Sequence, residues 1–109
     1  MRNLSCLLFA LLTLVATGAA QPARKAPEAA VTIRDSSYSP ASLTVKRGTI
    51  VIWTNADDQD HTVDAGDGSF SSGTLKRKQT FQYTFNKAGK YPYGCKFHPR
   101  QKGTIIVIE

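Results

Sequence analysis

A cysteine, a histidine and a glutamine follow one another at intervals of three residues near the end of this 109-residue sequence. They are Cys95, His98 and Gln101, and an apolar run typical of a strand follows them. A thiolate and an imidazole on one tight loop are two of the three ligands of a trigonal copper site. The only other histidine is His61. We therefore expect His61, Cys95 and His98 to hold one copper ion, with Gln101 near its axis.

The first 20 residues predict a cleavable signal peptide. An arginine precedes an apolar run, and small residues end at Ala20, which suits signal peptidase. The run is too short for a stop-transfer helix, so we expect export to the periplasm and no membrane insertion after processing. Cys6 leaves with this segment, and Cys95 remains as the single cysteine. An odd cysteine in an exported chain is a metal ligand, a free thiol or half of an intermolecular disulfide.

Residues 21–29 contain two prolines and several alanines and predict a flexible N-terminal arm. Residues 30–109 are expected to form one domain. Short runs of β-branched and aromatic residues in that domain predict strands at 30–34, 43–46, 49–55, 61–63, 80–85, 90–95 and 104–108. No segment shows a sustained helical period. The pattern therefore indicates an all-β, antiparallel sandwich or small barrel.

The charge of the chain is positive and unevenly distributed. The whole sequence has 14 basic and 8 acidic side chains, and loss of Arg2 with the signal peptide leaves a net charge of +5. The acidic residues near His61 are Asp57, Asp58, Asp60, Asp64 and Asp67, and the basic residues near His98 are Lys96, Arg100 and Lys102. Export argues against nucleic acid as the partner. The basic residues instead predict a protein partner with an acidic surface.

Several short motifs run in a fixed order from residue 31 onward. They are Tyr38-x-Pro40-x-x-Leu43, Val51-x-Trp53-x-Asn55, Asp60-His61-Thr62-Val63, Phe70-Ser71-Ser72-Gly73 and Tyr91-x-Tyr93-x-Cys95-x-x-His98-Pro99. In this order and spacing they resemble the cupredoxins, and most of all the amicyanin and plastocyanin-like branch. The resemblance implies an antiparallel Greek-key β-sandwich of about seven to eight strands that carries one electron on a type 1 copper ion.

Two positions depart from the pattern of that family. Cupredoxins usually have methionine where this chain has Gln101. Either Gln101 supplies an axial amide oxygen, as in the stellacyanin-like members, or it turns to solvent and leaves the axial position open. We favour ligation, and a harder oxygen ligand predicts a lower reduction potential than methionine would give. Thr62 stands where many members have asparagine, and its hydroxyl could brace the loop near Cys95.

We predict an exported, monomeric one-electron carrier that exchanges electrons at the edge of His98. Redox partners would dock there, near Pro99 and Arg100. No catalytic triad or pair of carboxylates indicates an enzyme. The alternative is a periplasmic copper carrier or copper-resistance protein without electron transfer. A metal-free module or nucleic-acid-binding barrel fits less well, because the aromatic residues alternate inward and the chain is expected to be exported.

Overall fold

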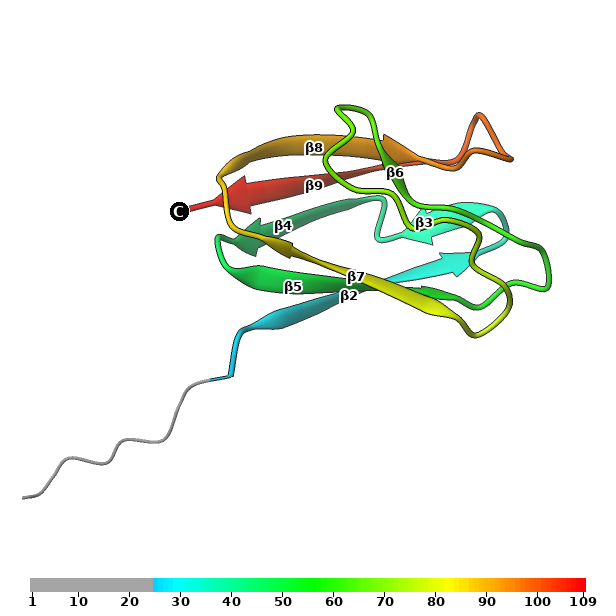
Figure 1. Cartoon of the computed structure of the whole chain (residues 1–109), viewed down its shortest axis with the longest axis horizontal. Helices are drawn as coiled ribbons and strands as arrows, with labels where there is room; N and C mark the ends of the chain where they lie inside the picture. The colour runs from blue at the N-terminus through cyan, green and yellow to red at the C-terminus, as the bar shows by residue number, and fades with distance from the viewer. Residues whose placement is uncertain (1–24) are drawn as a thin grey trace, which may run out of the picture.

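Two four-stranded sheets pack face to face in the computed structural model, which describes residues 25–109 (Figure 1). The first sheet has the order β3-β2-β5-β7 and the second β4-β9-β8-β6. The strands are β2 (Glu28–Arg34), β3 (Ser37–Ser39), β4 (Ser42–Lys46), β5 (Thr49–Asn55), β6 (Asp64–Ala65), β7 (Thr80–Phe85), β8 (Gly89–Gly94) and β9 (Lys102–Ile108). The predicted all-β sandwich is confirmed. The predicted signal peptide, residues 1–20, lies outside the described residues.

Two of the strand pairs run parallel rather than antiparallel. They are β2 with β5 and β4 with β9, whereas the other pairs are antiparallel. The chain crosses from the first sheet to the second between β3 and β4, and it returns to the first sheet in β5. Strands distant in the sequence therefore become neighbours. No helix in the described part of the chain has the length and apolar character needed to cross a membrane.

The structure differs from the predicted strands in several places. The first strand begins at Glu28, because Glu28 and Ala29 pair with β5, so these two residues do not belong to the predicted arm. Residues 61–63 are not a strand, and only an isolated bridge joins His61 to Leu75. The structure also contains two short strands that were not predicted, β3 and β6. A strand of three residues is too short for a recognisable alternation.

Trp53 on β5 forms the centre of the core. Its side chain is fully buried, and its ring lies 5.5–5.7 Å from the rings of Phe70, Phe81 and Tyr93. Phe70 also lies 4.9 Å from the ring of Tyr83, so it attaches the polar loop after β6 to the core. The alternation along β5 puts every second residue into this core.

Gly103 on β9 leaves room for the ring of Tyr93 on β8. The two residues are directly paired, and a Cβ atom on Gly103 would overlap the Tyr93 ring. Tyr93 in turn contacts Tyr38, with ring centroids 4.6 Å apart. This packing fixes Tyr93, which lies near the end of β8 and two residues before Cys95.

Candidate metal centre

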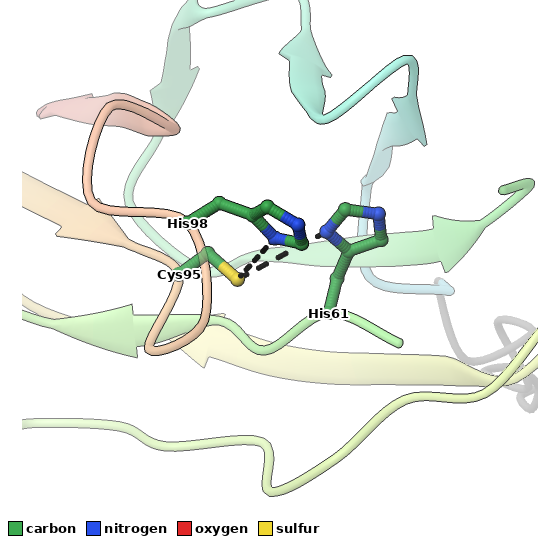
Figure 2. Close-up of side chains that lie close together, drawn as sticks. All are labelled: His61, Cys95 and His98. Atoms are coloured by element: carbon green, nitrogen blue, oxygen red, sulfur yellow. Dashed lines mark hydrogen bonds between the residues drawn. The ribbon is translucent and has the colours of Figure 1, made fainter. Parts of the chain in front are cut away.

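His61, Cys95 and His98 meet at the end of the sandwich away from the C-terminus (Figures 1 and 2). His61 lies on the connection between β5 and β6. Cys95 follows the last residue of β8, and His98 lies on the loop between β8 and β9. One donor atom from each residue lies within 4.8 Å of those of the other two. The fold thus brings together the three residues that the sequence singled out.

The spacing of these donor atoms fits a single metal ion. The Sγ atom of Cys95 lies 3.6 Å from Nδ1 of His98 and 3.9 Å from Nδ1 of His61 (Figure 2). A trigonal ion with bonds of about 2.3 Å to sulfur and about 2.0 Å to nitrogen holds these atoms about 3.7 Å apart. A thiolate with two imidazoles is the donor set of type 1 copper sites. The three residues therefore fit copper in both chemistry and separation.

Gln101 faces this cluster rather than solvent. Its side chain is 3% exposed, and its Oε1 atom lies 2.9 Å from Nδ1 of His61. The backbone N–H of Gln101 donates to the His98 carbonyl, and the N–H of Cys95 donates to the Gln101 carbonyl. The alternative in which Gln101 turns to solvent is therefore wrong. An amide oxygen is available beside the three donors.

Thr62 connects the two segments that carry the donors. Its backbone N–H donates to Sγ of Cys95 over 3.4 Å, and its hydroxyl accepts the N–H of Lys96 at 2.8 Å. The hydroxyl of Tyr38 donates to the Thr62 carbonyl at 2.6 Å. The predicted brace from the Thr62 hydroxyl is confirmed. It holds His61 and Cys95 at a fixed separation.

Hydrogen bonds favour the ionised form of Cys95. Burial alone would raise the pKa of its thiol, but the N–H groups of Thr62 and Phe97 and the imidazoles of His98 and His61 lower that pKa to about 6. A large fraction of the side chain is therefore thiolate at neutral pH. The thiolate is the form that binds a metal ion.

Asp57 is a residue of the site that the sequence analysis did not identify. It was grouped with the other aspartates near His61, yet its Oδ2 atom lies 2.7 Å from Nε2 of His61. Asp58 and Asp60 instead form surface ion pairs with Arg77 and Lys76. The only sequence signal for this contact was that Asp57 lies four residues before the candidate ligand His61. In a loop, that spacing is a weak indication of contact.

The surface next to His98 combines an apolar hollow with positive charge. Phe97 is 48% exposed, and a hollow of about 360 Å³ is lined by Ser36, Phe97, His98, Pro99, Arg100 and Gln101. Among residues 25–109, no acidic group forms an ion pair with Lys96, Arg100 or Lys102. These cations are free to meet a partner.

Comparison with known proteins points to one family. A profile of the cupredoxin-like domain matches residues 4–107. Amicyanin of Paracoccus versutus is 33% identical over 82 residues, which cover 71% of this chain and 62% of that protein. Amicyanin-alpha of Methylorubrum extorquens is 30% identical over 100 residues, covering 85% of this chain and 84% of its own length. The match spans less than two thirds of the Paracoccus amicyanins, 62% and 63%.

Solved structures agree with this comparison. A purple cupredoxin from Nitrosopumilus maritimus superposes with a TM-score of 0.69 at 31% identity, over 73% of this chain and 99% of that one. An amicyanin variant with glutamine in place of methionine, in the Cu(I) state, superposes with a TM-score of 0.70 at 31% identity. That match covers 74% of this chain and 82% of the variant.

Proposed function

This chain belongs to the cupredoxin-like family, and we propose that it is an exported type 1 copper protein that carries one electron between redox partners. His61, Cys95 and His98 would hold the copper, with the Gln101 amide oxygen on the axis. Residues 1–20 would direct export to the periplasm. The observation that carries the proposal is the meeting of one thiolate and two imidazoles beside an exposed apolar surface.

Copper bound to these residues would supply a one-electron couple between Cu(II) and Cu(I). The chain contributes rigidity, because a carrier is fast when its ligands move little between the two oxidation states. Thr62 links the His61 segment to the Cys95 loop, and the bond from the Gln101 N–H to the His98 carbonyl tightens that loop. The donor atoms lie at spacings close to those that a bound ion requires. These features support electron transfer.

Voltammetry of the copper-loaded protein tests this proposal. A carrier should give a reversible one-electron wave, with rapid self-exchange between the oxidised and reduced protein. The zinc-loaded protein is the control and should give no wave. A protein that retains copper but gives only a slow, irreversible response would be a copper carrier or buffer instead. That result would overturn electron transfer while leaving the metal site in place.

Gln101→Met is expected to raise the midpoint potential. A thioether is a softer ligand than an amide oxygen and stabilises Cu(I) relative to Cu(II). Gln101 is buried with its oxygen beside His61, so methionine at this position would reach the same point. Potentiometric titration measures the change, and Gln82→Met on the exposed face of β7 is the matched control. Equal potentials for wild type and Gln101→Met would contradict axial ligation.

Electron transfer with an acidic redox partner is expected to slow as ionic strength rises. Arg100 lines the hollow beside His98, and Lys96 and Lys102 lie two and four residues from His98 along the chain. None of the three has an ion-pair partner among the described residues. Such charges steer association, and screening them lowers the second-order rate by about tenfold or more. Stopped-flow kinetics with Arg100→Glu should show a slower reaction at low salt. Lys87→Glu, in the turn between β7 and β8, is the control for total charge, and an equal effect of both variants would contradict a local docking surface.

A further inference from the structure

The turn between β2 and β3 has an unusual backbone. Asp35 and Ser36 have φ angles of 54° and 53°, a conformation that residues other than glycine rarely adopt. In this turn the N–H of Asp35 donates to Oδ1 of Asp57 at 2.7 Å, and the N–H of Ser36 donates to Oδ2 of Asp57 at 3.0 Å. Two consecutive backbone donors therefore converge on one carboxylate from a distant part of the chain.

The same carboxylate reaches the metal centre. Oδ2 of Asp57 accepts the Nε2–H of His61 at 2.7 Å, where the Asp57 side chain is 14% exposed and that of His61 is fully buried. The backbone N–H of Asp57 donates to Oδ1 of Asn55 at 2.9 Å, which fixes the residue from a third direction. Asp57 thus has little freedom to move, and a charge-assisted bond joins it to His61.

An ionised carboxylate fixes which nitrogen of His61 can bind a metal ion. The N–H groups of Asp35 and Ser36 and the Nε2–H of His61 all meet the two carboxylate oxygens of Asp57, so this side chain acts here only as an acceptor. A carboxylate only accepts hydrogen bonds, so Nε2 of His61 carries its hydrogen whether or not a metal is present. Nδ1, the nitrogen 3.9 Å from Sγ of Cys95, remains as the donor that faces the centre.

We propose that Asp57 is a positioning residue of the metal centre, clamped by the Asp35–Ser36 turn so that it holds the imidazole of His61 with Nδ1 toward the metal. The proposal rests on the proposed function in one respect, namely that His61 is a ligand. It also gives the turn between β2 and β3 a role in metal binding. Neither residue of that turn contributes a ligand atom.

Asp58 provides a matched control for this proposal. It is the next residue in the same loop and has the same charge, but its carboxylate pairs with Arg77 at 2.8 Å on the surface. Removal of the Asp58 carboxylate changes the net charge by the same amount as removal of the Asp57 carboxylate, but only the Asp57 change breaks a contact with His61. A difference between the two variants therefore reports the clamp rather than charge alone.

The experiment compares Asp57→Ala, Asp57→Asn and Asp58→Ala with the wild type. Copper(I) affinity, measured by competition with a chromophoric chelator, should fall about 10–100-fold in Asp57→Ala. Asp58→Ala should match the wild type, and Asp57→Asn should fall between the two because its amide oxygen still accepts the His61 Nε2–H. NMR of the metal-free protein should show a slowly exchanging Nε2 proton of His61 in the wild type and a rapidly exchanging one in Asp57→Ala.

Two outcomes would overturn the proposal. One is equal copper affinity in Asp57→Ala and Asp58→Ala. The other is rapid exchange of the His61 Nε2 proton in the wild type. Thermal unfolding of each metal-free variant checks that it is folded, and the wild-type exchange measurement stands even if Asp57→Ala does not fold. Failure of the proposed function looks different, because the Nε2 proton would stay protected while the wild type failed to form a type 1 copper site.

Discussion

Replacement of Cys95 by alanine is expected to abolish the intense visible absorption of the copper-loaded protein. That band and the narrow parallel hyperfine splitting in EPR both arise from a covalent copper–thiolate bond. Cys95 is buried and is the only free cysteine among residues 25–109. Residues 25–109 contain no methionine, so Cys95 supplies the only sulfur atom in the described part of the chain. The variant should lose the band completely rather than shift it.

The measurement is an absorption and EPR spectrum after addition of one equivalent of Cu(II). Thr84→Ala, an exposed substitution on β7, is the control and should keep the spectrum of the wild type. Far-UV circular dichroism should show the same sheet content in all three metal-free proteins. If the wild type gave only ordinary tetragonal copper, or if Cys95→Ala kept the intense band, a thiolate ligand would be excluded.

Trp53→Ala is expected to lower the free energy of unfolding of the metal-free protein by about 3–5 kcal/mol. The side chain is fully buried, and its ring packs against those of Phe70, Phe81 and Tyr93. Both sheets and the loop after β6 therefore meet on this one residue. The loss removes both apolar burial and aromatic contacts. It is a large part of the total stability of a small domain, which is about 5–15 kcal/mol.

Urea denaturation followed by circular dichroism measures this loss without relying on tryptophan fluorescence. Phe97→Ala is the matched control, because it also truncates an aromatic ring, but one that is 48% exposed. Surface substitutions of this kind change stability by about 0.5 kcal/mol or less. Similar losses in both variants would mean that Trp53 does not hold the two sheets together.

Residues that alternate strictly were predictable from the sequence. Strands 49–55 and 80–85 have the predicted bounds, because their side chains point in turn toward the core and away from it. The meeting of His61 with Cys95 and His98 was predictable from chemistry, since these are the residue types that share a metal ion. The position of Gln101 in the loop favoured an orientation toward the metal centre. Its burial could be seen only in the fold.

Features that depend on distant backbone were not predictable. Asp57 acts through the N–H groups of Asp35 and Ser36, which lie 22 and 21 residues away, and only the fold brings that turn to it. Its carboxylate therefore looks in the sequence like those of Asp58 and Asp60. The parallel pairing of β4 with β9 depends in the same way on the path of the whole chain. Local propensity does not determine such pairings.

The position of β9 sets the order of events when this protein is made. It is the last strand in the chain and lies between β4 and β8. A growing polypeptide that has not yet released β9 from the ribosome leaves those two strands without their shared neighbour. The loop that bears Cys95 and His98 then has only one of its two flanking strands. Assembly of the metal centre should therefore follow the synthesis of β9, and a chain that lacks this strand would have no assembled site with which to capture copper.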